Sequence, residues 1–433
     1  MLSNFHPWLR LFETYFVRLS LFHFTSALLP LILLNGASEG DGVDVYAADL
    51  SLVAKVNLLI YLITFILAAL RWKKILNLVT KEVFYWPFLL VAASSVLWSS
   101  LPDTTFRGVV YALGTTLFGI YFASRYSLRE QLGHITWTLG FIMISSLLFV
   151  VALPHYGIMG GIHVGAIRGV YLHKNVFSPM IILAVVVFFL QAQEGGRNKW
   201  YLWGLFVLTV AFGIMSRSST AIGLMIVMLG ICTSFRIFRW RYEILVSSML
   251  ALVIVGGGAV VWLVQFGGAD LIFEALGKDA TLSSRTEIWY HVWIKIQEQP
   301  LLGYGLSGFW NGLNGPSAYI ERVMRTQVHY AHNGFLDLCL SFGFIGLSFF
   351  LVHFSVLVSK SLAILRKSNT IVGFWPIVLM AYIFMTNLTE GNLSSLSTFA
   401  WVLYTSMSFS LADVVRSRAS RSPQVLGSRY DFG

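Results

Sequence analysis

The segment HNGFLDLCLSFGFIG begins with a histidine and an asparagine, His332 and Asn333, at the edge of a long apolar run. Imidazole titrates near neutral pH, so His332 could act as a general base. The same pair could instead start a helix, because an asparagine side chain caps the first backbone N–H groups of a helix. The segment therefore predicts either a helix cap or the edge of a reaction site.

Two arginines are the second chemical feature. Arg217 lies in a short turn, SRSST, and Arg285 opens a predicted helix, where a cation opposes the helix dipole. A bound anion would offset both placements, because a guanidinium group binds phosphate oxygens through two parallel hydrogen bonds. The two arginines therefore indicate an anionic ligand.

The elements that position these residues are predicted to be membrane helices. The chain has 433 residues, of which 57% are hydrophobic and only 12% are charged, against about 25% charged residues in soluble domains. Its apolar runs approach the ~20 residues that span a bilayer, which predicts an all-α polytopic membrane protein with about twelve transmembrane helices. The predicted spans are roughly 17–35, 51–70, 83–99, 107–123, 133–153, 176–193, 200–215, 219–235, 243–264, 333–359, 371–387 and 394–412.

The basic residues predict how the chain is oriented. If the connections alternate from a cytoplasmic N-terminus, 20 of the 30 Lys and Arg residues fall on the cytoplasmic side. The positive-inside rule therefore places both termini in the cytoplasm, and the net charge of +10 reflects membrane orientation rather than nucleic-acid binding. The short connections on the outer side hold only Lys55, Arg107, Arg168, Lys174 and Arg217.

One outer connection, 265–332, is far longer than an ordinary loop and is predicted to be structured. Its SRTE sequence, 284–287, fits a capping box, and Ile288, Val292 and Ile296 recur at helical spacing. We expect an amphipathic helix that lies on the membrane face as a lid or platform. The predicted organisation is transmembrane helices one to nine in 1–264, the loop in 265–332, helices ten to twelve in 333–412 and a basic cytoplasmic tail in 413–433.

An uninterrupted helix from His332 would carry a stripe of small residues. At about 100° per residue, Gly343 returns to within about 20° of His332, with Cys339 and Gly346 close to the same line. Small residues in such a stripe let a second helix approach closely. Helix packing thus explains the glycines but not the histidine.

On this topology four polar segments meet at the outer interface: RGVYLHKN, SRSST, SSRTEIW and the His332–Asn333 pair. Arg168 and Lys174 could equally extend toward lipid headgroups, as cations at span ends commonly do. His173 alone is more typical of a structural interfacial histidine. The segments nevertheless bring together six candidates: Arg168, His173, Lys174, Arg217, Arg285 and His332.

These motifs resemble those of the O-antigen ligase and polymerase superfamily of bacterial membrane glycosyltransferases. HNGFLDLCLSFGFIG is similar to the family's His-Asn, nine-residue spacer, Gly-x-x-Gly signature, and QPLLGYGLSGFW to its Pro-Leu-Leu-Gly-x-Gly segment. SRSST and SSRTEIW resemble its two arginine segments. The motifs cover about residues 165–350, and YLHKN is most similar to the exopolysaccharide-polymerising branch typified by succinoglycan production.

The resemblance implies a bundle similar to that of GT-C glycosyltransferases, with one large helical periplasmic loop, in the bacterial inner membrane. The implied donor is a glycan on undecaprenyl diphosphate and the acceptor is the growing glycan, with a chain-length regulator and export machinery as possible partners. His332 would activate the acceptor hydroxyl, while Arg217 and Arg285 would stabilise the departing diphosphate. Asp337 would orient the histidine or satisfy a buried contact, and Asn333 would orient the sugar or cap the helix. The implied substrate-binding residues are Arg168, His173, Lys174, Asn175, Asn333 and Asp337.

No cofactor or metal is expected, because the outer loops hold no Asp-x-Asp, His-Glu-x-x-His or clustered His/Cys pattern. The arginines could supply the electrostatic stabilisation that a metal would otherwise provide. An O-antigen ligase, which transfers the glycan to lipid A core, is the first alternative. A transporter or flippase is the second, disfavoured because the predicted spans carry few charged residues near their centres.

Overall fold

The computed structural model describes residues 7–37, 49–196, 198–233, 285–368, 370–391, 393 and 395–419. Within these ranges the chain is helical and forms no β-strand beyond one isolated bridge, between Ile158 and Ile167. The predicted all-α class is therefore confirmed for this part of the chain. The α-helices are α1 (Pro7–Phe24), α2 (Leu29–Leu33), α3 (Ser51–Ala69), α4 (Trp72–Val79), α5 (Tyr85–Ser94), α6 (Pro102–Arg125), α7 (Leu128–Ala152), α8 (Pro154–Gly157), α9 (Lys174–Glu194), α10 (Lys199–Met215), α11 (Ser219–Thr233), α14 (Arg285–Glu298), α15 (Ala318–Met324), α16 (Gly334–Leu365), α17 (Ile371–Asn387) and α18 (Phe399–Ala419).

The helices of the described part are those of a membrane protein. Five of them are long and apolar enough to cross a bilayer: α3, α6, α7, α9 and α16. Shorter apolar helices are α10, α11, α17 and the segment Tyr85–Leu97. The predicted span 243–264 lies outside the described residues, so the count of twelve stays a prediction.

The first predicted span, 17–35, is wrong as a single helix. The helix α1 begins earlier, at Pro7, and ends at Phe24, and the short α2 follows. Ser26 and Leu28 adopt positive φ angles of 59° and 63°, a conformation that no continuing α-helix contains. Pro30 then lies in the first turn of α2, where its missing N–H costs nothing.

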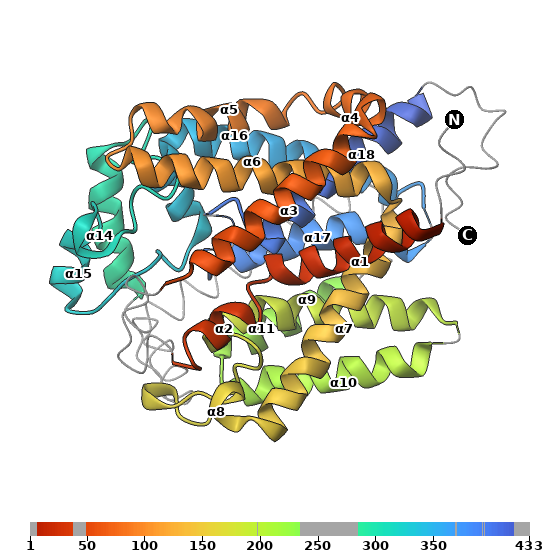
Figure 1. The fold of residues 1–433 in the computed structure, drawn as a ribbon, viewed down its shortest axis with the longest axis horizontal. Coiled ribbons are helices and arrows are strands. Elements are labelled where there is room, and N and C mark those ends of the chain that lie inside the picture. The colour runs from red at the N-terminus through yellow and green to blue at the C-terminus, as the bar shows by residue number, and fades with distance from the viewer. Residues whose placement is uncertain are drawn as a thin grey trace, which may run out of the picture.

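The bundle has two chemically different ends (Figure 1). We call the end that carries α8, α14 and α15 the loop end, and the end that carries α4 and the C-terminal part of α18 the basic end. At the basic end, Glu13 pairs with Arg71 at 3.2 Å and with Arg125 at 2.7 Å. Lys81 pairs with Asp413 at 2.7 Å. Arg71, Lys81 and Arg125 therefore lie at the same end of the bundle.

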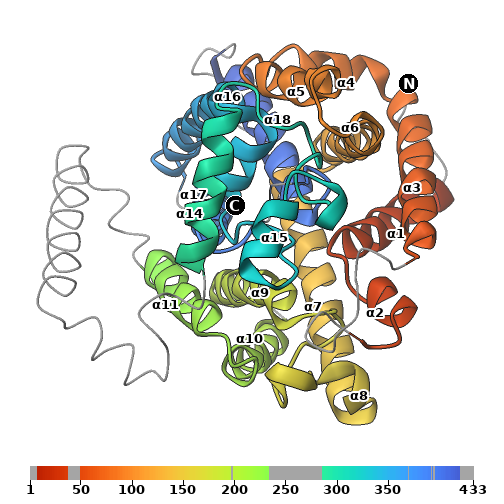
Figure 2. The same cartoon turned by 90° about the vertical axis from the view of Figure 1, so that its left-hand side faces the viewer.

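At the loop end, α14 and α15 lie across the ends of the membrane helices (Figure 2). The predicted amphipathic helix is confirmed as α14, and Ile288, Val292 and Ile296 are all buried. The apolar stripe packs against α16 and α15, and the expected position of the helix on the membrane surface stays a prediction. The helix is a platform held by protein contacts.

The helix α16 is broken at Gly343, where φ is 61° and ψ is −168°. The chain of the loop inserts there: Phe344 N–H donates to the Pro300 carbonyl at 2.8 Å, and Tyr304 N–H donates to the Leu340 carbonyl at 2.7 Å. A Cβ atom at Gly343 would lie 2.2 Å from the Leu301 carbonyl carbon. The predicted uninterrupted stripe is therefore wrong. Glycine is required here for a left-handed conformation and a close backbone approach, not for contact with another helix.

Replacing Gly343 with alanine should destabilise the protein, because the added methyl group meets backbone atoms and φ is unfavourable for any L-residue. We expect Gly343→Ala to lower the free energy of unfolding by about 2–4 kcal/mol. Thermal unfolding of the purified protein in detergent measures the change. Gly204→Ala is the control, since a Cβ at that helical position meets nothing within 4 Å. Equal melting temperatures for the two variants would contradict this account.

Candidate functional site

The backbone that leads into His332 is fixed on both sides of one residue, Ala331. The Ala331 N–H donates to Asp337 Oδ1 at 3.1 Å, and Trp289 Nε1 of α14 donates to the Ala331 carbonyl at 2.8 Å. Asp337 Oδ1 also accepts from Trp310 Nε1 at 2.8 Å, and the residue is 1% exposed. Of the two roles predicted for Asp337, the buried polar contact is therefore observed, and this contact positions the residue before the histidine.

His332 lies at the very start of α16 in a strained conformation, with φ at 51°. Asn333 caps the helix, since its Oδ1 accepts from the N–H groups of Phe335 at 3.0 Å and Leu336 at 3.3 Å. The predicted cap is thus confirmed. The His332 ring lies 4.2 Å from the Tyr330 ring, centroid to centroid, and the side chain is 23% exposed.

Glu390, in the connection between α17 and α18, is the partner of His332. Its Oε2 lies 3.3 Å from His332 Nδ1, and its Oε1 accepts from Arg285 Nη2 at 3.0 Å. The sequence interpretation missed this residue. One signal was available: Glu390 is the only charged residue between the predicted spans 371–387 and 394–412. The structure therefore brings His332 and Arg285 together through one carboxylate.

The connection that carries Glu390 is anchored at its base. The buried Asn387 accepts the Leu393 N–H at 3.2 Å, and the Glu390 N–H donates to the Thr386 carbonyl at 2.8 Å. A Cβ at Gly334 would lie 2.1 Å from Asn387 Oδ1. The glycine after Asn333 thus lets α17 approach the start of α16, which holds Glu390 beside His332.

This arrangement can prepare an imidazole base. With the proton on Nδ1, His332 donates to Glu390 and leaves the lone pair of Nε2 for a substrate proton. Nε2 has no hydrogen-bond partner among the residues that the structure describes. Arg285 needs no bound anion to explain its place at a helix start, because Glu390 already offsets its charge.

Arg217 belongs to a second group at the loop end. It lies in the turn between α10 and α11 with φ at 51°, and its Nη1 donates to the Val164 carbonyl at 3.1 Å. The guanidinium group packs on Gly165, and the side chain is exposed. No carboxylate pairs with it in the described ranges. Its charge is therefore available to an anion.

His173 and Lys174 lie beside the same segment. The His163 and His173 rings are 5.2 Å apart, and His173 caps α9 by accepting the Asn175 N–H at 3.1 Å. Burial, followed by the charge of Lys174, lowers the pKa of His163. His163 was not predicted as a site residue, because a single histidine in a glycine-rich loop does not by itself indicate a functional site. The Asn175 side chain is partly buried and has no hydrogen-bond partner among the described residues.

Arg168 has a different environment from the one expected of a substrate-binding residue. It is 1% exposed, and its guanidinium group donates to backbone carbonyls of Gly36, His155, Tyr156 and Leu172. These bonds tie α2, α8 and the start of α9 together. Arg168 therefore organises the loop end, and its place among the substrate-binding residues stays a prediction.

The two groups lie at the same end of neighbouring helices. α11, which follows Arg217, packs against α17, which precedes Glu390, and α9 packs against both. These helices bring the exposed guanidinium of Arg217 and the His332–Glu390–Arg285 group to the loop end. The arrangement can bind an anion and accept a proton.

Comparisons with known proteins find two similarities. The family model described as O-Antigen ligase matches residues 204–351, which include Arg217, Arg285 and His332. The exopolysaccharide production protein ExoQ of Rhizobium meliloti (strain 1021) is 25% identical over 333 residues, covering 72% of this chain and 74% of that protein. These matches confirm the resemblance predicted from the motifs: the chain is similar to the O-antigen ligase family and to an exopolysaccharide production protein.

Proposed function

We propose that this protein is a glycosyltransferase that polymerises oligosaccharide repeat units linked to undecaprenyl diphosphate. The observation that carries the proposal is His332, oriented by Glu390 through Nδ1, with Nε2 open at the loop end. The similarity to a protein named for exopolysaccharide production favours polymerisation over the ligase alternative. The site would face the periplasm of a bacterial inner membrane, with twelve spans and both termini in the cytoplasm.

In the proposed reaction, the acceptor hydroxyl gives its proton to Nε2 of His332 while its oxygen bonds to the anomeric carbon of the donor. The bond from that carbon to the diphosphate oxygen breaks, and the lipid diphosphate leaves with the electron pair. Glu390 would stabilise the imidazolium that forms. Arg217, which has no carboxylate partner in the described part, would stabilise the charge on the leaving diphosphate.

The remaining candidates would act around these groups. Lys174 and Asn175 lie beside the Arg217 group and would contact the donor. Arg285 would act chiefly by holding Glu390 rather than by binding phosphate alone. Metal independence belongs to the proposal, as do a growing glycan as acceptor and a chain-length regulator and export machinery as partners.

One observation favours the transporter alternative. His353 Nε2 lies 3.6 Å from Glu82 Oε1 inside the bundle, and Lys360 contacts the same carboxylate. His353 is therefore a buried ionisable group inside the predicted span 333–359, and such groups can mark a transport path. Reconstituted vesicles distinguish the two functions: a polymerase elongates lipid-linked repeat units, whereas a flippase only moves them across the bilayer.

Loss of the proposed base should nearly abolish transfer. We expect His332→Ala to reduce the polymerisation rate by about 10²–10⁴-fold, the contribution typical of general bases. Purified protein with lipid-linked repeat units, scored for polymer length, measures the rate. The exposed His155 at the same end, replaced as His155→Ala, is the control and should retain activity. Polymer of normal length from His332→Ala would overturn the assignment.

Glu390 should act through His332. We expect Glu390→Gln to lower the rate by about 10–100-fold and to add almost nothing to His332→Ala, because residues that act as one unit are not additive. The measurement is a double-mutant cycle on kcat, with thermal unfolding recorded for each variant. Additive losses would show that Glu390 has a separate, structural effect.

The charge and shape of Arg217 should both matter. We expect Arg217→Ala to reduce kcat by about 100-fold or more, and Arg217→Lys to restore only part of it, since lysine cannot form the two-bond contact with phosphate. Steady-state kinetics with the lipid-linked donor tests this. Arg107→Ala, at another exposed arginine near the loop end, is the control. Full activity of Arg217→Ala would exclude the proposed role.

A further inference from the structure

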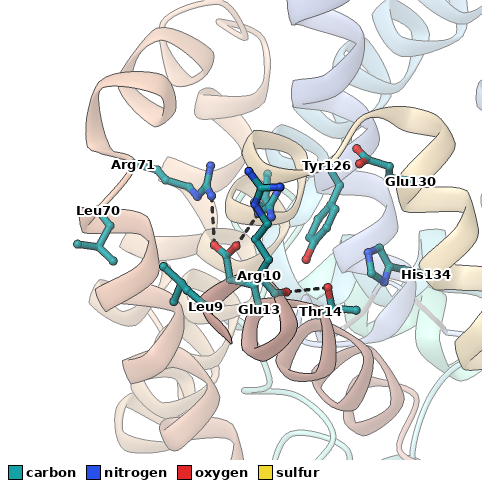
Figure 3. Close-up of a pocket in the computed structure, with 10 residues that line it drawn as sticks. Leu9, Arg10, Glu13, Thr14, Leu70, Arg71, Tyr126, Glu130 and His134 are labelled. Carbon is teal, nitrogen blue, oxygen red and sulfur yellow. Dashed lines mark hydrogen bonds and ion pairs between the residues drawn. The ribbon is translucent and has the colours of Figure 1, made fainter. Parts of the chain in front are cut away.

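A large polar cavity opens at the basic end, the opposite end of the bundle from His332. Its volume is about 590 Å³. The walls come from α1, the C-terminal ends of α3 and α6, and the first turns of α7. Figure 3 shows the lining side chains, which are Leu9, Arg10, Glu13, Thr14, Leu70, Arg71, Arg125, Tyr126, Glu130 and His134.

The cavity contains more positive than negative charge. Three arginines line it against two carboxylates, and both carboxylates are already engaged. Glu13 binds Arg71 at 3.2 Å, Arg125 at 2.7 Å and the Tyr121 hydroxyl at 3.0 Å. The Glu130 carboxylate accepts from Ser127 N–H and Oγ at 2.8 Å each in the cap of α7. The third guanidinium group in the cavity therefore has no carboxylate partner among the lining residues.

That third group is Arg10. Its guanidinium has no hydrogen bond or ion pair in the part of the chain that the structure describes. In Figure 3, the Arg10 side chain extends upward between Arg71 and Tyr126, over Glu13. A cation held close to other guanidinium groups is unfavourable unless an anion joins them.

His134 gives a second, independent indication of a ligand. The residue is 7% exposed, and its Nδ1 is buried without a hydrogen-bond partner. Its ring contacts the Tyr126 ring at a centroid distance of 4.4 Å and lines the same cavity. A buried, unpaired polar nitrogen is costly, so a polar group in the cavity would stabilise this site.

We propose that this cavity binds the phosphate group of an anionic phospholipid headgroup. Arginines bind phosphate oxygens through paired N–H groups, and basic pockets between membrane helices are typical headgroup sites. Apolar side chains exposed beside the cavity offer a surface for the acyl chains. On α1 these are Trp8, Phe12 and Tyr15, and on α3 they are Phe65 and Ile66, with Leu70 just after it. The site is independent of the proposed transfer reaction.

A headgroup in this position would connect α1 with α3, α6 and α7, so it should stabilise the fold. The test uses the full-length protein, delipidated in neutral detergent and then titrated with phosphatidylglycerol or phosphatidylcholine. Native mass spectrometry reports bound lipid, and thermal unfolding reports stabilisation. We expect phosphatidylglycerol to bind and to raise the melting temperature, and phosphatidylcholine to do neither.

Two substitutions test whether the lipid binds in this cavity. Arg10→Gln should weaken phosphatidylglycerol binding about tenfold, the size expected for one charge-assisted contact. Arg416→Gln should leave it unchanged, because Arg416 is exposed at the same end but does not line the cavity. Equal binding of the two lipids, or equal affinity of Arg10→Gln and the wild type, would overturn the proposal.

Inorganic phosphate, titrated in the same detergent without lipid, separates two sources of the same chemistry. If phosphate alone protects the wild type but not Arg10→Gln, and phosphatidylglycerol does not bind, the site takes a soluble phosphate and the lipid assignment is wrong. Protection by phosphatidylglycerol that excess inorganic phosphate reduces would support the lipid headgroup.

Discussion

The loop end depends on backbone groups that the break at Gly343 leaves without helical partners. Inside a bilayer such groups must be satisfied by protein, because neither lipid nor bulk water can bond them. The segment 300–305 satisfies them through the Phe344 N–H and the carbonyls of Leu340 and Ser341. The same segment follows α14 directly, so the insertion fixes α14 on α16. Trp289 of α14 then holds the backbone beside His332.

This backbone insertion gives the histidine a rigid support without placing it on a rigid helix. His332 lies one residue before the cap of α16 and has a left-handed φ, so neighbouring contacts must maintain its position. The Asp337 and Trp289 contacts fix the preceding residue, and Glu390 fixes the ring. Positions held in this way are typical of functional sites, where strain is offset by surrounding packing.

Apolar patterning was sufficient to predict many elements but not their interruptions. The predicted span 371–387 matches α17, and the SRTE capping pattern led to α14. The break at Gly343 could not be predicted from α16 alone, because it depends on backbone groups of a distant segment. The early end of α1 depends on positive φ angles at Ser26 and Leu28. A positive φ is rarely predictable from the sequence at a residue other than glycine.

The candidate site also contains residues that the sequence predicted and residues that it did not. The candidates His332, Arg217 and Arg285 were predicted from residue type, position and the motifs around them. Glu390 was missed because its partners are 58 and 105 residues away, and a single acid in a loop has no periodic pattern. The sequence also could not show that four backbone carbonyls accept hydrogen bonds from Arg168.

In the proposed mechanism His332, oriented by Glu390, takes the acceptor proton while Arg217 faces the leaving diphosphate. An experimental structure of the full-length protein with a non-hydrolysable lipid-diphosphate oligosaccharide and a short glycan acceptor tests this most directly. We expect an acceptor hydroxyl within hydrogen-bond distance of His332 Nε2 and diphosphate oxygens against Arg217. A diphosphate bound away from Arg217, with the acceptor remote from His332, would contradict it.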